Sequence, residues 1–380
     1  MKYDLIVVGG GVLGTFSAYH ALKKGLSVLL VEKDNQASGS TVQNFGQVVP
    51  SGFGKKWCNI GRRSLETYGE IQEKVDITFT QNGSVYIASD AEECQLIHEL
   101  HQIQDTNGYA SELLSKEQLA HRFPDFKATY GREGLFFRDD ASVDPSQMIH
   151  KLQAYMVAQM GLVFKSNETV IAIEESSAEV GVQTSSGKKF LGDRVWVHSG
   201  YVFNLLYPEV FQNSGLVVSQ LQMLKTLPLH NYNLKSNILT GLTIRRYEAF
   251  EECPSFSKLS KLSHYALLQK YGIHILFKQE ADGSVIIGDS HEYASCNEME
   301  KLGLGSKEII DELMIVEAQR ILDFPKSAIS RRWIGRYSQH KDEVFEYDVS
   351  KRIHICTGIG GKGMTSGAGY TEMKIEAAGF

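Results

Sequence analysis

The chain of 380 residues has few cysteines, few prolines and no long apolar run. Its five cysteines are odd in number and lack CxxC spacing, which argues against a disulfide framework or a structural zinc site. No apolar run approaches the roughly 18–20 residues that cross a bilayer, and the N-terminal residues do not resemble a signal peptide. The chain also has no excess of positive charge: it contains 39 Lys and Arg but 45 Asp and Glu. The resulting net charge of −6 does not favour binding to nucleic acid. We expect a reduced, cytoplasmic protein without a membrane span.

Glycine, in contrast, is abundant at 35 residues, and it marks a strand–helix–strand unit at the N-terminus. Residues 3–8 predict a buried strand, residues 16–24 a helix and residues 26–31 a second strand. The second strand ends on an acid, Glu32. A βαβ unit of about 30 residues with these features is typical of a Rossmann-like, dinucleotide-binding domain.

The glycines of this unit follow the pattern Gly9-x-Gly11-x-x-Gly14. The first glycine allows a tight turn, the second lets a pyrophosphate approach the backbone, and the third lets the helix pack closely on the sheet. The N–H groups at the start of the helix then face the phosphates. Glu32 is expected to bind the ribose hydroxyls, which disfavours the 2′-phosphate of NADP. This motif alone does not separate NAD from FAD.

Two further segments indicate a flavin. Residues 38–47 are rich in small hydrogen-bond donors and poor in charge, which suits contact with a diphosphate or a flavin. Residues 360–365 read Gly-Gly-Lys-Gly-Met-Thr and follow a predicted strand at residues 354–357. The helix that begins there would stabilise the negative charge of a reduced flavin, to which the Lys362 ammonium would add.

The rest of the chain is less regular and carries no internal repeat or long linker. Helices are predicted at residues 60–75, 91–120, 146–160 and 306–322. Strands are predicted at residues 217–225, 238–245, 273–277 and 284–288. The two ends of the chain predict one α/β domain into which strand-rich segments are inserted. The predicted cofactor domain comprises residues 1–76, 140–215 and 326–380, and the predicted substrate domain comprises residues 77–139 and 216–325.

These features together resemble the D-amino-acid oxidase superfamily of FAD-dependent oxidoreductases, which includes glycine oxidase and sarcosine oxidase. More closely, the chain resembles a bacterial subfamily associated with aminophosphonate metabolism. The stretches that carry this closer resemblance are residues 44–47, 221–226, 245–247, 272–274 and 288–293. The resemblance implies an α/β fold, α+β overall, with a Rossmann-like FAD domain and an inserted antiparallel-sheet substrate domain. It also implies that a small amine is oxidised by hydride transfer to flavin N5, and that the imine is then hydrolysed.

The resemblance further assigns residues to the cofactor, with the backbone of Val170 meeting the adenine. The predicted FAD contacts are Gly9, Gly11, Val12, Leu13, Gly14, Glu32, Lys33, Ser40, Thr41, Asn44, Phe45, Gly46, Gln47, Val170, Ser199, Gly200, Gly360, Gly361, Lys362, Gly363, Met364 and Thr365. No cysteine matches a position of covalent attachment, so we expect non-covalent FAD.

The substrate end departs from the glycine oxidase pattern. Those enzymes carry a Trp-x-Gly-x-Arg stretch whose Arg binds the substrate carboxylate, whereas this chain has Tyr337 at that position. Arg336, one residue earlier, would point to the opposite side of a strand. A substrate-contacting Tyr of the family matches His274, and the oxygen-activating Lys of sarcosine oxidase matches Ile286. The electron acceptor is therefore expected to be O2 or another oxidant.

An anionic substrate such as a phosphonate needs cationic or bidentate donors. The predicted catalytic residues are His274, Tyr337 and Gln47. The predicted substrate contacts are Arg245, His274, His291, Arg332 and Tyr337. Each arginine also has a competing interpretation as a surface salt bridge, and only one of two adjacent arginines in a strand points inward. No metal site is predicted.

Four functions stay open on the sequence. The favoured one is an FAD-dependent oxidoreductase of an aminophosphonate or its N-alkyl or hydroxy derivative. A glycine, sarcosine or D-amino-acid oxidase is the alternative within the same class. A flavoprotein that binds FAD only for structure, or that modifies tRNA, is a third function, and the acidic net charge counts against tRNA. A nicotinamide-only dehydrogenase is the fourth. The expected partners are a small-molecule amine and an electron acceptor, and a homo-oligomer is left open.

Overall fold

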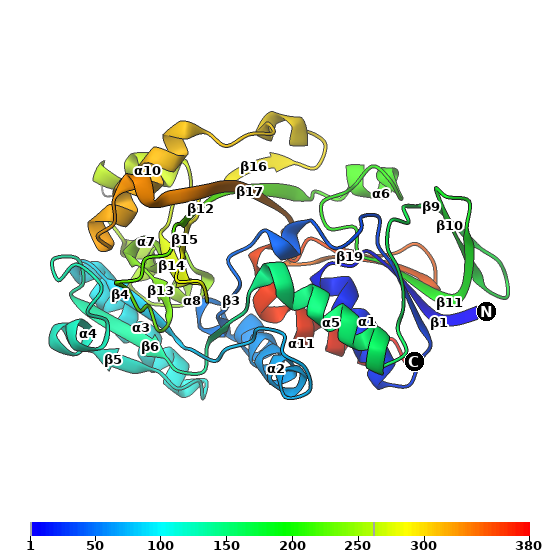
Figure 1. Cartoon of the computed structure of the whole chain (residues 1–380), viewed down its shortest axis with the longest axis horizontal. Coiled ribbons are helices and arrows are strands. Elements are labelled where there is room, and N and C mark those ends of the chain that lie inside the picture. The colour runs from blue at the N-terminus through cyan, green and yellow to red at the C-terminus, as the bar shows by residue number, and fades with distance from the viewer. Residues whose placement is uncertain (1, 261–262) are drawn as a thin grey trace.

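The computed structural model describes residues 2–260 and 263–380, and two large sheets lie side by side in it (Figure 1). The first sheet has the order β18-β19-β11-β1-β2-β8, with β10 and β9 added at β11. Its strands are β1 (Lys2–Val8), β2 (Val28–Val31), β8 (Val163–Lys165), β9 (Val170–Glu175), β10 (Val180–Thr184), β11 (Lys189–Val197), β18 (Phe345–Asp348) and β19 (Ile353–Thr357). The pairs that join β19, β11, β1, β2 and β8 are all parallel. Strands buried on both faces explain the continuous apolar runs of the sequence.

Four helices pack together beside this sheet: α1 (Val12–Lys23), α2 (Lys55–Gln72), α5 (Pro145–Gln159) and α11 (Gly363–Ala377) (Figure 1). Helix α1 starts directly after Gly11, and every residue from Leu13 to Ala21 is buried. A helix that is enclosed on all sides belongs to the core. Gly25, with φ of +83°, follows the end of α1. The predicted strand–helix–strand unit is therefore confirmed.

The second sheet has nine strands in the order β16-β12-β15-β14-β13-β4-β6-β5, with β17 also paired to β12. Its strands are β4 (Ser84–Ala88), β5 (Glu112–Leu114), β6 (Glu133–Phe137), β12 (Val217–Thr226), β13 (Asn237–Leu239), β14 (Leu276–Gln279), β15 (Val285–Gly288), β16 (Glu292–Ser295) and β17 (Ile329–Gln339). All pairs in this sheet are antiparallel except β13 with β4. Strand β17, which lies within the predicted cofactor domain, pairs with β12 of this sheet along nearly its whole length. The domain boundaries themselves stay a prediction.

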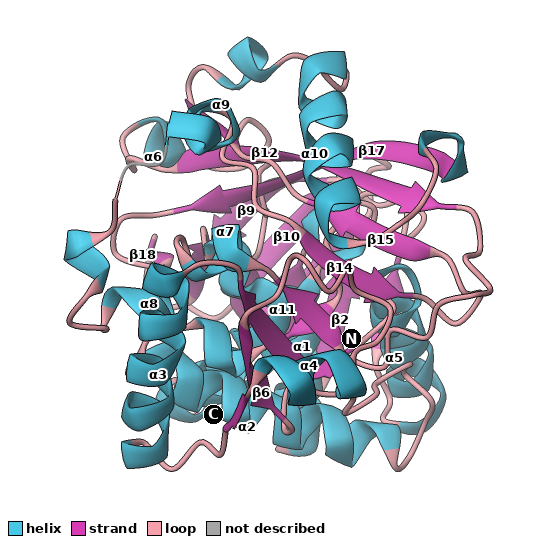
Figure 2. Ribbon diagram, turned by 90° about the vertical axis from the view of Figure 1, so that its left-hand side faces the viewer, coloured by secondary structure: helices cyan, strands magenta, loops and turns pink. Residues whose placement is uncertain are grey.

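Helices flank the second sheet, and α10 packs on β12 and β15 at the top of the view in Figure 2. The bounds of these helices are α3 (Ala91–Thr106), α4 (Lys116–Arg122), α6 (Pro208–Gln212), α7 (Gly241–Ile244), α8 (Glu248–Glu251), α9 (Ala266–Lys270) and α10 (Glu308–Ile321). A short pair, β3 (Gln47–Val48) with β7 (Ala141–Ser142), connects the two halves.

Two predicted elements differ from the structure. The single helix predicted at residues 91–120 is broken, because Gly108 has φ of +68° and a capping box at Ser115 starts the separate helix α4. The strand predicted at residues 238–245 ends at Leu239 and gives way to α7. The chain after α7 is thus a turn rather than a strand, and alternation no longer decides which side chain points inward.

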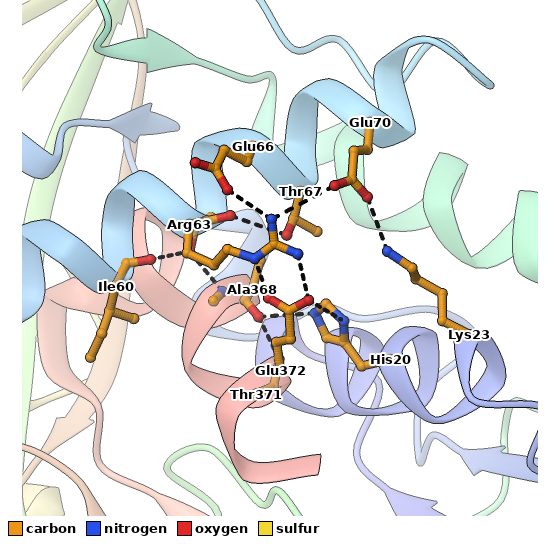
Figure 3. Close-up of polar contacts among 12 residues, drawn as sticks. His20, Lys23, Ile60, Arg63, Glu66, Thr67, Glu70, Ala368, Thr371 and Glu372 are labelled. Atoms are coloured by element: carbon orange, nitrogen blue, oxygen red, sulfur yellow. Dashed lines mark hydrogen bonds and ion pairs between the residues drawn. The ribbon is translucent and has the colours of Figure 1, made fainter. Parts of the chain in front are cut away.

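A polar network fastens α1, α2 and α11 to one another (Figure 3). The Arg63 guanidinium donates to both carboxylate oxygens of Glu372, at 2.5 and 2.6 Å, and also to Glu66 at 2.7 Å. Glu70 lies 3.7 Å from the same guanidinium and accepts from Lys23 at 3.0 Å. A bidentate pair between helices is stronger than an isolated surface ion pair.

Replacing Arg63 with Met should lower the free energy of unfolding by about 1–2 kcal/mol at neutral pH. Burial raises the pKa of Glu372, but the hydrogen bonds from Arg63 hold it below its ordinary value overall. The stabilisation is therefore present near pH 7 and is lost as the pH falls and Glu372 is protonated. Urea unfolding at pH 7 and pH 4 should show a smaller difference between variant and wild type at the lower pH. Arg138→Met, at an exposed site, is the control.

Candidate active site between the two sheets

A cavity of about 620 Å³ is lined by residues from both large sheets. The first sheet contributes the end of β1 and the end of β2, including Val8 and Val31. The second sheet contributes Leu221 and Met223 of β12, together with residues of β17. In open α/β sheets, ligands bind outside the carboxyl ends of the parallel strands, which is where this cavity begins.

At two of the three glycines in the turn after β1, any side chain would clash with a backbone carbonyl group. A Cβ on Gly9, which has φ of +102°, would lie 2.2 Å from the carbonyl oxygen of His198. A Cβ on Gly14 would lie 1.9 Å from the carbonyl oxygen of Gly9. A Cβ on Gly11 would contact only Thr41 Oγ1, at 3.2 Å, and Gly11 lines the cavity. Gly9 and Gly14 therefore serve the fold, while Gly11 keeps a wall of the cavity open.

Glu32, at the end of β2, is buried and is held by two backbone groups. Its Oε2 accepts from the N–H of Gly10 at 2.7 Å, and its Oε1 accepts from the N–H of Asp34 at 3.0 Å. These contacts fix the carboxylate at the cavity wall. The position agrees with the predicted ribose contact, which stays a prediction.

The loop of residues 38–47 is bound tightly to its surroundings. Thr41 Oγ1 accepts from the N–H of Val12 at 2.8 Å, which joins the loop to the start of α1. Asn44 closes a turn within the loop, because its Oδ1 accepts from the N–H of Gly46 at 2.7 Å. The buried Lys278 of β14 donates to the carbonyl of Phe45 at 3.1 Å. Burial lowers the pKa of Lys278, although its ion pair with Glu280 works against this.

The turn before α11 also lines the cavity, at Gly360 to Thr365. Lys362 forms an ion pair with Glu248 and lies 5.7 and 5.6 Å from the ring centres of Phe53 and Trp57. The ammonium is therefore partly neutralised by a neighbouring carboxylate. The predicted contribution of Lys362 to the charge around a flavin is untested.

Every residue predicted to contact FAD lines this one cavity. Two of them carry buried polar atoms, Gln47 Nε2 and Ser199 Oγ, that have no hydrogen-bond partner within residues 2–260 and 263–380. Orphaned polar atoms on a cavity wall indicate a polar ligand. The cavity therefore fits FAD, held by the glycine turn, the loop of residues 38–47 and the start of α11. The individual contacts stay predictions.

At the substrate end, the structure brings His274, His291 and Tyr337 to the same cavity. His274 Nε2 lies 2.8 Å from Asp289 Oδ1, and the His274 and His291 rings stack with centres 5.3 Å apart. Burial opposes ionisation of Asp289, but His291, His274 and Arg246 together hold its pKa below the ordinary value. Asp289 is therefore a buried carboxylate at neutral pH.

Two predicted substrate contacts do not reach the cavity. Arg245 is enclosed by three acids, with its guanidinium 2.6 Å from Asp90, 3.1 Å from Glu92 and 2.7 Å from Glu93. These partners satisfy its charge, so its role is structural. Arg332 is 39% exposed and lies 3.3 Å from Asp311, outside the cavity. Arg332 makes the surface ion pair of the competing interpretation, whereas the ion pairs of Arg245 are buried, because only 6% of its side chain is exposed.

Three residues that are not among the predicted substrate contacts, Arg246, Asp289 and Tyr293, share the cavity with His274. Arg246 lines it and donates to the hydroxyl of Tyr293 at 2.6 Å, and Asp289 lies between the two histidines. The stretch of residues 288–293 carried the signal for two of them, because it is specific to the subfamily resemblance and not required by the fold. A strand at residues 238–245 predicts that only one of Arg245 and Arg246 faces inward, and the structure places Arg246 rather than the predicted Arg245 at the cavity.

The architecture is mixed α/β, and its cavity lies where dinucleotide-binding α/β folds hold their cofactor. The chain belongs to the DAO family of FAD-dependent oxidoreductases, whose family model matches residues 4–373. The superfamily resemblance and the prediction of an FAD-dependent oxidoreductase are thereby confirmed. Because this family depends on FAD, the match argues against the alternative of a dehydrogenase that uses only a nicotinamide cofactor.

The chain is also similar, at low sequence identity, to individual proteins. The chain is 23% identical over 295 residues to glycerol 3-phosphate dehydrogenase from Caloramator mitchellensis, a match that covers 76% of this chain but only 56% of that enzyme. It is 20% identical over 384 residues to sarcosine oxidase subunit beta from Arthrobacter sp., covering 97% and 86%. The crystal structure of glycine oxidase from Bacillus cereus superposes with a TM-score of 0.76 at 19% identity, covering 99% and 95%. The predicted glycine oxidase-like fold is confirmed.

Within the described ranges, no helix combines the length and the apolar character that crossing a bilayer needs.

Proposed function

We propose that this protein oxidises the C–N bond of a small amine that carries a phosphonate group, or of its N-alkyl or hydroxy derivative. Bound FAD would supply the chemistry by accepting a hydride at N5. The chain would bind the substrate, orient the carbon next to nitrogen and keep water from the reacting atoms. The oxidised substrate is an imine, which water then hydrolyses to a carbonyl compound and an amine or ammonia.

The observation that carries the phosphonate part is the position of Arg246. Its side chain lines the cavity, whereas Tyr337 occupies the position where glycine oxidases are expected to carry the carboxylate-binding arginine. Arg246 is half-buried, and its Nη2 donates to the Tyr293 hydroxyl, which leaves further guanidinium N–H groups for a ligand. An anion with three oxygens suits such a planar set of donors.

Two relatives support the two halves of the proposed substrate by the names they carry. The sarcosine oxidase relative is named for an amine substrate, and the glycerol 3-phosphate dehydrogenase relative is named for a substrate with a phosphate group. A phosphonate-bearing amine combines the two features. The aromatic and aliphatic wall formed by Tyr247, Leu221, Met223 and Leu276 would exclude water around the reacting carbon.

The test is anaerobic bleaching of the flavin absorption by a panel of candidate substrates. The panel contains 2-aminoethylphosphonate, its N-methyl and hydroxy derivatives, glycine, sarcosine and D-alanine. We expect bleaching by the phosphonates and little by the three amino acids. Bleaching by glycine or sarcosine alone would replace the phosphonate with a carboxylate substrate. A yellow protein that none of these compounds bleaches would remove both substrate classes.

The electron acceptor is tested with the same reduced protein. Ile286 at the position expected to hold an oxygen-activating lysine supports an acceptor other than O2, and it lies in β15 outside the cavity lining. Admitting air to the bleached protein should therefore restore the flavin colour slowly. Rapid return of the colour would identify an oxidase.

A further inference from the structure

Of the two histidines that the described residues place at the substrate end, His291 has a ring nitrogen without a hydrogen-bond partner. Its Nδ1 lies 3.2 Å from the carbonyl oxygen of Gly272. A carbonyl oxygen only accepts, so Nδ1 must carry the proton and Nε2 must carry a lone pair. Among the described residues, no side chain or backbone group donates to this Nε2. His274 differs, because Asp289 and Thr243 lie 2.8 and 3.3 Å from its two ring nitrogens.

The surroundings of His291 hold its ring in one orientation. The backbone N–H of His291 donates to the carbonyl of Tyr271 at 2.9 Å. Gly272 has φ of +56°, and a Cβ there would lie 2.8 Å from the His291 Cβ. The ring stacks with those of His274 and Tyr293, whose centres lie 5.3 and 6.1 Å away. Only a glycine at position 272 permits this packing.

Oxidation of an amine requires a proton acceptor at this place. A primary amine with a pKa of about 10 reaches the site mainly as an ammonium ion, in which a proton is bonded to the nitrogen lone pair. Hydride loss from the neighbouring carbon needs that lone pair to form the C=N bond. The ammonium must therefore give up one proton first, and an oriented neutral imidazole is suited to take it.

We propose that His291 Nε2 accepts the proton of the substrate ammonium before the hydride leaves the neighbouring carbon. The N–H bond breaks and its electron pair returns to the nitrogen, while a new N–H bond forms on the imidazole. The hydride then carries two electrons to the cofactor, and the substrate becomes a protonated imine. Gly272 fixes the tautomer, and Asp289, whose Oδ1 lies 3.8 Å from Nδ1, stabilises the imidazolium. This inference rests on the proposed oxidation of an amine.

The charges around His291 link this step to anion binding. Burial lowers the pKa of His291 to about 3, Asp289 acts in the opposite direction, and the positive charge of Arg246 and the neighbouring His274 lower the pKa further. The remaining titratable neighbours are the hydroxyls of Tyr293 and Tyr337, whose rings lie 6.1 and 6.4 Å from the His291 ring. A phosphonate on Arg246 neutralises that cation and so raises the pKa of His291. Substrate binding would thus remove one of the charges that lower the pKa of His291, while the effect of burial remains.

The first test is the pH dependence of flavin reduction in His291→Gln. Glutamine accepts a hydrogen bond but takes no proton, so only substrate that is already neutral reacts. We expect the rate with 2-aminoethylphosphonate to fall about 100-fold at pH 7 and to rise with pH, reaching within about threefold of wild type at pH 10. His230→Gln, at an exposed site outside the cavity lining, should behave as wild type. A His291→Gln profile parallel to that of wild type would overturn the inference.

The second test needs no turnover and uses the wild-type holoenzyme. In 2-amino-2-methylpropylphosphonate, the carbon next to nitrogen has no hydrogen, so the compound can bind without being oxidised. With 15N-labelled histidine, binding should move the His291 ring resonances toward those of an imidazolium. Resonances that stay at the neutral position in a bound complex would exclude proton transfer. Failure of every aminophosphonate to bleach the wild-type flavin would instead contradict the proposed function, and the two failures are thus distinct.

Discussion

Arg246→Met should lower kcat/KM for 2-aminoethylphosphonate by about 100- to 1000-fold. A charge-assisted contact in a water-poor cavity contributes several kcal/mol, and about 3–4 kcal/mol corresponds to this range. Methionine retains most of the volume of the arginine stem, so the cavity wall is preserved. Stopped-flow flavin reduction over a range of substrate concentrations measures the effect, which should appear mainly as weaker binding. Loss of the cation also raises the pKa of His291, because Arg246 is one of the charges that lower it.

A substrate without the phosphonate and two further variants show whether the loss in Arg246→Met comes from anion binding or from a disturbed fold. Ethylamine, which lacks the phosphonate, should react equally slowly with wild type and Arg246→Met. Tyr293→Phe removes only the hydroxyl that accepts a hydrogen bond from Arg246. It should lower kcat/KM for 2-aminoethylphosphonate by no more than about fivefold, because the guanidinium remains. Arg138→Met, whose side chain is 81% exposed, should leave kcat/KM unchanged. An unchanged kcat/KM in Arg246→Met would remove the basis for a phosphonate substrate.

The cofactor side of the cavity was predictable because its signals are local. Gly9 is required by its φ of +102° and Gly14 by a contact within the same turn, and Glu32 follows the next strand directly. Each of these residues lies within one βαβ unit, where chain order and spatial order coincide. The predicted residues therefore came together in one cavity without knowledge of the second sheet.

The substrate side was less predictable because its residues meet only through tertiary contacts. The choice between Arg245 and Arg246 depended on whether residues 238–245 form a strand. The helix α7 replaced that strand, and the acids of α3 and its N-cap, which enclose Arg245, lie about 150 residues earlier in the chain. Asp289 was missed because no pattern within its own segment pairs it with His274. These contacts are set by the order of strands in the second sheet, which the sequence pattern does not specify.

Gly11→Ala should weaken FAD binding by about 100-fold or more while the apoprotein remains folded. The added Cβ would meet only Thr41 Oγ1, at 3.2 Å, a contact that a small shift of one side chain relieves. The methyl group would, however, occupy the cavity wall where the motif predicts close approach of a pyrophosphate. Titration of apoprotein with FAD, followed by quenching of flavin fluorescence, measures the affinity. Circular dichroism of the apoprotein measures whether the fold is retained.

Alanine substitutions at two other glycines serve as controls for Gly11→Ala. Gly69→Ala, in α2 with no atom within 4 Å of the added Cβ, should leave FAD affinity unchanged and slightly stabilise the helix. Gly14→Ala forces a Cβ to 1.9 Å from the carbonyl of Gly9 and should impair folding itself. Loss of FAD in Gly11→Ala together with a native circular dichroism spectrum therefore assigns the effect to the ligand. Retention of wild-type affinity would mean that the pyrophosphate does not pass over Gly11, and the predicted orientation of FAD along the glycine turn would have to be abandoned.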